Sequence, residues 1–177
     1  MREGSEFKPS EFIPKIEIGP EGTCKIKLGQ ITVDYDKPWK AAIRAAAPQT
    51  ATDFKIWDLQ AFQKESGGIE NADITLCGFQ RNWNIADAMG YQQQNNSIFA
   101  NPQQVLAIGE RYKTLNAALK MRRIKIVSFN PIIRIGKTRS TSKRRAISLW
   151  YEGDKRIAHA DNIELDYLQN SFFAVLD

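Results

Sequence analysis

Residues 111–145 read RYKTLNAALKMRRIKIVSFNPIIRIGKTRSTSKRR, and within them the spacing of the apolar side chains changes. Leu115 and Leu119 are four residues apart, which is the spacing of one helical face. From Ile124 onward the period is close to two, which is typical of a β-strand. The stretch therefore predicts a helical turn followed by strands, and it places the helices before a C-terminal antiparallel meander.

The same stretch contains twelve Lys or Arg residues and no Asp or Glu. Residues 1–105 contain 11 basic and 13 acidic side chains, a balance of −2, whereas residues 106–177 contain 14 and 7, a balance of +7. The two balances sum to the net charge of +5, so the positive charge is concentrated in the C-terminal part. Such an asymmetry indicates an anionic partner.

With 177 residues, 42% of them hydrophobic, the chain is expected to form a single domain over residues 11–177. Residues 1–10 are interpreted as a disordered or cloning-derived tail, because Gly-Ser-Glu-Phe at 4–7 is a common linker product. The longest apolar runs are only a few residues, which argues against association with a membrane. The N-terminal stretch lacks the apolar centre of a secretory signal, so we expect a cytoplasmic protein.

The fold class that we expect is α+β, with an antiparallel sheet, two or three helices and a C-terminal β-meander. Two alternating stretches, 12–18 and 23–33, predict an N-terminal hairpin in which Gly29 marks a β-bulge. Pro131 is expected to separate two strands. The further expected strands are 72–79, 124–129, 132–135 and 146–151, with two more within 156–168 and 171–176.

Three residues with short polar side chains precede helical patterns, where a side-chain oxygen can cap the helix N-terminus. The second of these helices is expected to stop at Gly90, before a polar loop at 92–97. The third begins with Pro102 in the first position and is the clearest helix in the chain. The expected N-caps are Asp36, Asn84 and Asn101.

The chain contains two cysteines, Cys24 and Cys77, and one histidine, His159. Each cysteine lies in an alternating apolar stretch, so we expect two unpaired, buried thiols, although a disulfide between them stays open. One histidine and two separated cysteines are too few for a common zinc site. No cofactor-binding motif occurs either, so the sequence predicts no metal, no cofactor and no catalytic residue.

The predicted binding site centres on the loop 136–145, GKTRSTSKRR, together with a basic pair before the first strand of the meander. Lys and Arg side chains in such a loop can lie along phosphates while Ser and Thr add hydrogen bonds. The alternative is a solvated hairpin tip that only keeps the protein soluble. The predicted contact residues are Arg122, Arg123, Lys137, Arg139, Lys143, Arg144 and Arg145.

We therefore expect a small, non-enzymatic protein that binds DNA or RNA, or acts as an accessory factor, through residues 111–145. An interaction module for an acidic protein is the alternative, and an enzyme with an unrecognised site is the weaker one. Gly136-Lys137-Thr138 does not complete a phosphate-binding P-loop, because the earlier glycine of that motif would fall at Pro131. Glu164 and Asp166 share one face of an expected strand, where a solvated pair is commoner than an acid–base or metal pair.

The chain from about residue 73 to its end carries a further pattern. A strand ends in Phe79-x-Arg81, a short helix ends in Gly90, and the chain closes on Phe172-Phe173-Ala174-Val175. Between them runs Ala100-Asn101-Pro102-Gln103-Gln104-x-Leu106-Ala107-x-Gly109-Glu110-x-Tyr112. This order resembles a set of uncharacterised bacterial proteins, which tend to end in a basic pair where this chain has Leu176-Asp177. The resemblance implies one α+β domain and brings no activity with it.

Overall fold

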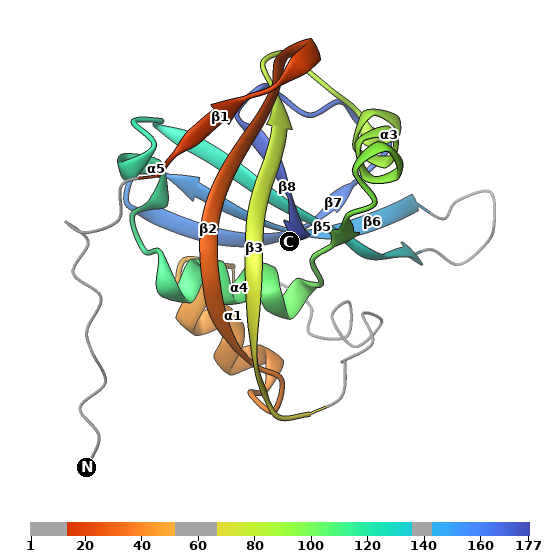
Figure 1. The fold of residues 1–177 in the computed structure, drawn as a ribbon. Helices are drawn as coiled ribbons and strands as arrows, with labels where there is room; N and C mark the ends of the chain where they lie inside the picture. Colours follow the sequence, from red (N-terminus) through yellow and green to blue (C-terminus); the bar gives the residue numbers. More distant parts are fainter. Residues whose placement is uncertain (1–13, 52–66, 136–142) are drawn as a thin grey trace.

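The computed structural model describes residues 14–51, 67–135 and 143–177 and shows a curved sheet with helices on both of its faces (Figure 1). The strands are β1 (Ile16–Ile18), β2 (Thr23–Asp34), β3 (Ile69–Phe79), β4 (Ile98–Phe99), β5 (Arg123–Ile135), β6 (Lys143–Glu152), β7 (Lys155–Asn162) and β8 (Ser171–Leu176). The α-helices are α1 (Trp39–Ala46), α3 (Ile85–Asn95), α4 (Pro102–Arg111) and α5 (Leu115–Ala118). The α+β class is confirmed, but the described residues alone contain four α-helices instead of two or three. The predicted tail at residues 1–10 lies outside the described residues.

The strands form one sheet in the order β1-β2-β3-β8-β5-β6-β7, with β4 also beside β8. The neighbours are antiparallel except for β5 and β8, which are parallel. β5, β6 and β7 form an antiparallel meander as predicted, but β8 does not continue it. β8 lies between β3 and β5, so it joins strands β1 to β3 to strands β5 to β7.

The sequence of β8 explains its central position. The stretch SFFAVL is apolar on both faces, and its first five residues are buried. Phe173 pairs with Cys77 of β3 on one side and with Val127 of β5 on the other. A strand that is apolar on both faces is stable only when both faces are covered, so it takes an interior place in the sheet.

The N-terminal hairpin forms as predicted. β1 pairs antiparallel with β2, with Ile18 opposite Cys24, and a 3-10 turn at Pro20–Gly22 connects them. The β2–β3 register shifts between Lys27 and Gly29, which confirms the predicted bulge. Gly29 has a φ of 73°, a conformation that costs glycine little and other residues more.

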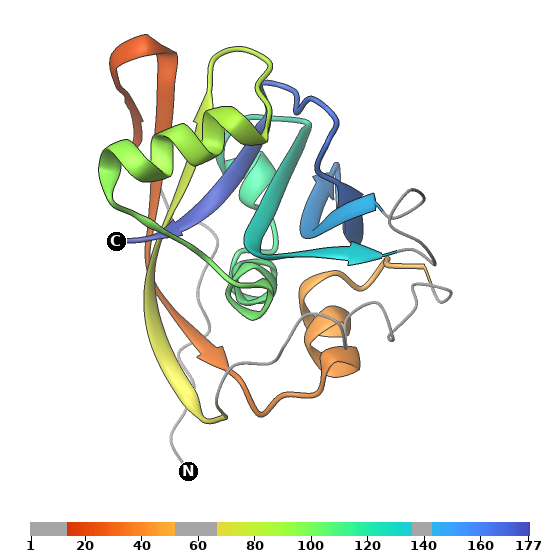
Figure 2. The same cartoon turned by 90° about the vertical axis from the view of Figure 1, so that its right-hand side faces the viewer.

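The prediction of two strands separated at Pro131 is wrong, because β5 continues through this residue. β5 turns sharply partway along its length (Figure 2), and the register of its pairing with β6 shifts between Ser128 and Ile133, on either side of Pro131. β4 then takes the place beside β8 that β5 leaves, with Phe99 opposite Val175. The Ser128 hydroxyl donates a hydrogen bond of 2.7 Å to the carbonyl of Ala100 and so ties the bend to the segment after β4.

Helix α4 lies within the curve of the sheet, as the view along its axis shows (Figure 2). The residues from Pro102 to Gly109 are all buried. α1 crosses α4 at Gly109, where a Cβ atom would lie 2.9 Å from the carbonyl oxygen of Ala46. The Tyr112 hydroxyl donates a hydrogen bond of 2.6 Å to the carbonyl of Leu28, which ties the end of α4 to β2.

Aromatic side chains fill the space between the other face of the sheet and α3. Trp83 stacks on Tyr167 with ring centroids 4.6 Å apart, and its Nε1 donates to the Ser171 carbonyl at 3.1 Å. Tyr91 of α3 and Phe99 of β4 both contact the Phe173 ring edge-on. These rings are buried, so they stabilise the fold and are not available to stack on bases.

Two of the helix predictions need correction. α3 continues past Gly90 to Asn95, so the polar residues after Tyr91 belong to the last, largely exposed turn of the helix and not to a loop. Asn96 follows as the C-cap, and its φ of 49° is the left-handed conformation common after helices. Asp36 does not cap α1: its Oδ2 accepts a hydrogen bond of 3.0 Å from the backbone N–H of Gly68.

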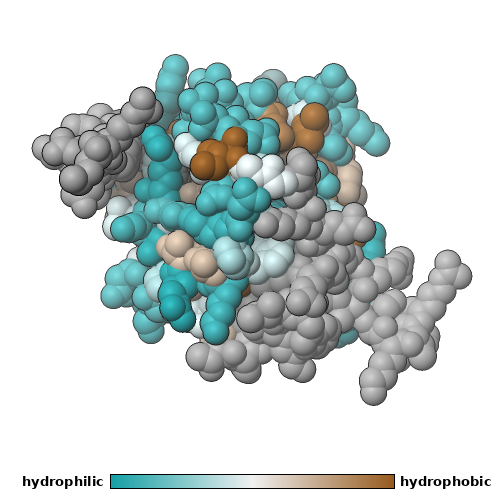
Figure 3. Space-filling view, turned by 90° about the horizontal axis from the view of Figure 1, so that it is seen from below, coloured by the Kyte–Doolittle hydropathy of each residue, from teal (hydrophilic) through white to brown (hydrophobic). Residues whose placement is uncertain are grey.

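Where described residues form the surface seen from below the view of Figure 1, it is mostly hydrophilic, with small hydrophobic spots (Figure 3). The large apolar side chains that are exposed in the described residues come from several elements and loops. Single exposed apolar side chains are normal for a folded protein. The exposed large apolar side chains of the described residues are Ile16, Ile18, Ile69, Ile98, Leu165 and Leu168.

The predicted N-caps at Asn84 and Asn101 are confirmed, and each forms a reciprocal capping box. Asn101 is buried, and its Nδ2 also donates to the Tyr35 hydroxyl at 3.2 Å, whereas Asn84 is exposed. We predict that Asn101→Ala lowers the free energy of unfolding by about 2 kcal/mol and Asn84→Ala by about 1 kcal/mol. Denaturant unfolding of both variants measures the two losses of unfolding free energy. Equal losses would contradict the expectation that the buried cap at Asn101 stabilises the protein more than the exposed cap at Asn84.

The structure confirms that Cys24 and Cys77 are free, and both are buried. Burial raises the pKa of the Cys77 thiol to about 11 and also raises the pKa of Cys24. Because the thiolate is the nucleophile, we predict that neither thiol is alkylated by iodoacetamide at pH 8 in the native protein and that both are alkylated after unfolding. Mass spectrometry counts the adducts, and rapid labelling of the native protein would contradict this prediction.

Candidate functional site

The predicted contact residues that the structure describes fall into two groups. One group lies where β5 begins and the other lies where β6 begins. Because β5 and β6 are antiparallel, with Arg123 opposite Glu152 and Ile135 opposite Lys143, the groups lie at opposite ends of this hairpin. The first group is Arg122 and Arg123, the second is Lys143, Arg144 and Arg145, and Lys137 and Arg139 lie outside the described residues.

The first group belongs to the connection from α4 to β5, in which residues 111–123 hold five cations and no acid. Lys113, Lys120 and Arg122 are exposed and form no ion pair with another described residue. Arg123 pairs with Glu152, and the hydrogen bond in this pair lowers the pKa of the Glu152 carboxyl. Three cations in this connection therefore have no ion-pair partner within the described part of the chain.

Backbone contacts hold the first group in place. The N–H of Gly153, in the turn between β6 and β7, donates to the Arg122 carbonyl at 3.0 Å. The Asn116 amide nitrogen of α5 donates to the Gly153 carbonyl at 2.8 Å and to the Arg122 carbonyl at 3.4 Å. The start of β5 is thus anchored to α5 and to the β6–β7 turn, while the basic side chains stay exposed.

The second group is built into the sheet. β6 begins at Lys143, so the last three residues of the predicted loop 136–145 are strand residues. Arg144 Nε lies 3.3 Å from Glu164 Oε1, and Arg145 Nη1 donates to the Ala160 carbonyl at 2.9 Å. Of these three cations only Lys143 is exposed without a partner among the described residues.

Glu164 and Asp166 do not share the face of a strand. β7 ends at Asn162; Glu164 lies in the turn that follows it, and Asp166 lies in the irregular segment after that turn. Leu165, which would have been buried in a continued strand, is 64% exposed. The described residues contain no group of three or more His, Cys, Asp or Glu that could hold a metal ion.

The single histidine belongs to a cluster that the sequence did not reveal. His159 lies against Trp150 with ring centroids 4.7 Å apart. Lys125 Nζ lies 4.1 Å from the Trp150 ring centroid and 3.1 Å from Asp161 Oδ2. Burial is the main cause that lowers the His159 pKa, and Lys125 lowers it further, while Asp161 opposes the shift. Lys125 and Asp161 contact each other, so the two charges of this cluster form an ion pair that packs on the sheet.

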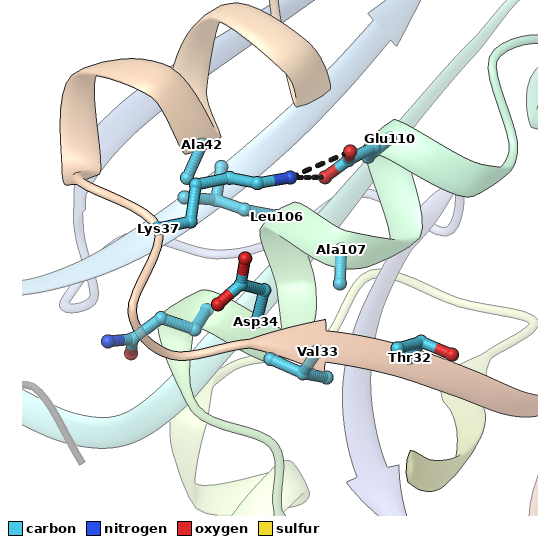
Figure 4. A pocket seen from close by; sticks show the side chains of 9 residues that line it. Thr32, Val33, Asp34, Lys37, Ala42, Leu106, Ala107 and Glu110 are labelled. Atoms are coloured by element: carbon cyan, nitrogen blue, oxygen red, sulfur yellow. Dashed lines mark hydrogen bonds and ion pairs between the residues drawn. The ribbon is translucent and has the colours of Figure 1, made fainter. Parts of the chain in front are cut away.

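A pocket of about 200 Å³ lies between the end of β2, α1 and α4 (Figure 4). Its walls combine apolar side chains, such as Val33 and Leu106, with several polar ones. Lys37 Nζ donates to both carboxylate oxygens of Glu110 at 2.7 Å across its opening. Asp34 rises from the end of β2 toward the same space.

Gln103 distinguishes this pocket from the rest of the described surface. Its side chain is in the first turn of α4 and lines the pocket, yet the residue is only 6% exposed. Neither the amide oxygen nor the amide nitrogen has a hydrogen-bond partner among the described residues. Leaving such a group unsatisfied costs about 1–3 kcal/mol, so its position needs an explanation.

Sequence reasoning missed Gln103 because it is one of two adjacent glutamines at a helix start. Gln104 completes the capping box with Asn101, and Gln103 carries no such signature. The one available signal was its spacing: Gln103, Leu106 and Glu110 recur on one face of α4. Only the packing of α1 and β2 against α4 turns that face into a pocket.

A larger pocket of about 380 Å³ lies between the β1–β2 turn and α3. Lys25 Nζ lies 5.4 Å from the Tyr91 ring centroid at its edge. The polar side chains that line it, such as Gln94, are exposed or have partners, and none is a buried amide without a hydrogen bond. Among the residues that line this second pocket, therefore, no buried polar group lacks a hydrogen bond, unlike Gln103 in the first pocket.

No family model, curated protein or solved structure matches this chain. The resemblance to uncharacterised bacterial proteins therefore stays a prediction. Within the described ranges, no helix combines the length and the apolar character needed to cross a membrane.

We predict that Gln103→Met stabilises the protein. Methionine matches glutamine closely in length and in helix propensity, and it removes the buried amide without a partner. The free energy of unfolding should rise by about 1 kcal/mol. The matched control is Gln93→Met on the exposed face of α3, which should leave stability nearly unchanged. Thermal and denaturant unfolding decide between the two, and a loss of stability in Gln103→Met would show that the amide has a partner.

Proposed function

We propose that this protein is a non-enzymatic nucleic-acid-binding or accessory protein that contacts the phosphate backbone of DNA or RNA. The observation that carries the proposal is the concentration of exposed cations in the α4–β5 connection. Lys113, Lys120 and Arg122 are exposed there without an ion pair among the described residues. Side chains of this kind bind phosphates through charge and are largely independent of base sequence.

The architecture of the connection supports this function. The backbone of Arg122 is held by Gly153 and Asn116, so the exposed cations project from a fixed support. Little backbone order has to be gained on binding, which lowers the entropic cost of the complex. The acids nearest in sequence to residues 111–123 are Glu110, which is paired with Lys37, and Glu152, which is paired with Arg123.

The β6 end plays a smaller part in this proposal. Arg144 and Arg145 already interact with Glu164 and with the Ala160 carbonyl, so moving them to a phosphate would break contacts within the fold. Lys143 is exposed and is the described residue of that group that can contact a phosphate at little cost. Lys137 and Arg139 stay predicted contacts outside the described residues.

We predict that Lys120→Gln combined with Arg122→Gln weakens binding to DNA and RNA of any sequence alike. Fluorescence anisotropy with labelled duplex and single-stranded oligonucleotides over a salt series measures the effect. The slope of log affinity against log salt should flatten by roughly 0.7–0.9 for each lost phosphate contact. Stability should change by no more than about 0.5 kcal/mol, because both side chains are exposed.

The matched control is Lys40→Gln combined with Arg44→Gln on α1, where both side chains are exposed. Each double variant removes two positive charges from the net +5, so both carry +3. Equal weakening in the two variants would show diffuse attraction instead of a site. If the unmodified protein does not bind nucleic acid at low salt but binds poly-glutamate, the partner is an acidic protein and the nucleic-acid proposal is wrong.

A further inference from the structure

Three cations surround one carboxylate where the α4–β5 connection meets the turn between β6 and β7. In the strand register, Glu152 of β6 lies opposite Arg123 of β5 on one side and opposite Lys155 of β7 on the other. Arg122 comes directly before this row of residues, and its carbonyl accepts a hydrogen bond of 3.0 Å from the N–H of Gly153. The four charged residues that form this basic cluster are Arg122, Arg123, Glu152 and Lys155.

We propose, building on the nucleic-acid-binding function proposed above, that the basic cluster binds the phosphates of a double-stranded nucleic acid. Lys155 is then a further contact residue, outside the segment 111–145 to which the sequence pointed. Tertiary structure brings it there, because the pairing of β7 with β6 places Lys155 beside Glu152.

The charges of the basic cluster favour an anion. The hydrogen bond from Arg123 lowers the pKa of the Glu152 carboxyl, and the charges of Arg122 and Lys155 lower that pKa further. Arg122 and Lys155 are exposed and form no ion pair with another described residue, so they can contact a phosphate without breaking one. The turn adds one exposed acid, Asp154, so three cations face two carboxylates and the balance is +1.

The support of the basic cluster is fixed by the sheet. The Asn116 amide nitrogen donates to the Gly153 carbonyl at 2.8 Å and so holds the turn against α5. Neighbouring strands lie about 4.8 Å apart, so the backbones of Arg123 and Lys155, two strands apart, are separated by roughly 10 Å. The charges along one strand of a duplex are spaced about 3.4 Å along the helix axis, so the basic cluster spans more than one phosphate.

The aromatic side chains at this end of the molecule are not available to bases. Residues 111–123 and 150–155 contain Tyr112, Trp150 and Tyr151. Both tyrosines are buried, and the Trp150 ring centroid already lies 4.1 Å from Lys125 Nζ and 4.7 Å from the His159 ring centroid. Proteins that bind single strands commonly stack the bases on exposed aromatic rings. Binding by these segments depends on charge instead, and a duplex carries charge more densely than a single strand.

Lys155→Gln in the full chain tests the further contact residue. Fluorescence anisotropy over a salt series measures its affinity for a labelled duplex DNA, a duplex RNA and a single strand of the same sequence. At about 0.1 M salt we expect the duplex affinity to fall roughly five- to tenfold, and the salt slope to flatten by roughly 0.9. The unmodified protein should bind a duplex more tightly than the single strand, and the tighter duplex identifies the source of the phosphates.

The matched control is Lys27→Gln on β2. Lys27 and Lys155 are both exposed strand residues without an ion pair within the described ranges. Each variant removes one positive charge from the net +5, so both carry +4. Lys27→Gln should keep the duplex affinity of the unmodified protein.

Glu152→Gln gives a second readout that does not depend on Lys155. Removing this carboxylate frees Arg123 for a phosphate, so the duplex affinity should rise roughly twofold or more. Glu70→Gln on β3 is the matched control, because Glu70 is exposed and the variant carries the same net charge of +6. A purely structural role of Glu152 would not produce a gain in affinity.

The outcomes separate the basic cluster from the general function. If the unmodified protein binds no nucleic acid at low salt, both proposals are wrong. If it binds, but Lys155→Gln and Lys27→Gln have equal affinities, the nucleic-acid function stands and the basic cluster is not its site. Equal or tighter binding of the single strand would overturn the assignment to a duplex. Circular dichroism checks that each variant is folded.

Discussion

The structure depends on the pairing of β8 with β3 on one side and with β5 on the other. The strand is the last in the chain and yet occupies the interior of the sheet, because both faces of SFFAVL are apolar and need cover. Phe173 joins the aromatic rings under α3, while Phe172 and Ala174 belong to the core around α4. One strand therefore connects the two hydrophobic cores, and neither half of the sheet would be complete without it.

The inward position of α4 follows from this arrangement. A helix inside a curved sheet must be apolar nearly all round, and buried residues fill α4 from Pro102 to Gly109. Gly109 permits the close crossing of α1, and the buried side chain of Arg156 donates through Nη1 to the Gly109 carbonyl. Against this background a glutamine at the start of the helix, with no partner for its amide, is an exception to the rule that shapes the rest of α4.

The positive charge of the C-terminal region serves more than one purpose. Lys125 pairs with Asp161, Arg144 with Glu164 and Arg123 with Glu152, so part of the excess is used between neighbouring strands and turns. The two exposed pairs among these, Arg144 with Glu164 and Arg123 with Glu152, contribute little to stability individually. Among the exposed cations that stay outside such pairs in the described residues, Lys113, Lys120 and Arg122 all belong to the α4–β5 connection, which is why we propose this end of the molecule for an anionic partner.

Local patterns in the sequence were sufficient for the helix starts at Asn84 and Asn101, the bulge at Gly29 and the α+β class, because these features depend on neighbouring residues. The position of β8, the unbroken course of β5 past Pro131 and the split of the basic residues into two groups depend on pairing between distant strands. The Gln103 pocket likewise needs β2, α1 and α4 to meet. Tertiary structure decided these features, because contacts between residues far apart in the chain leave no periodic trace in the sequence.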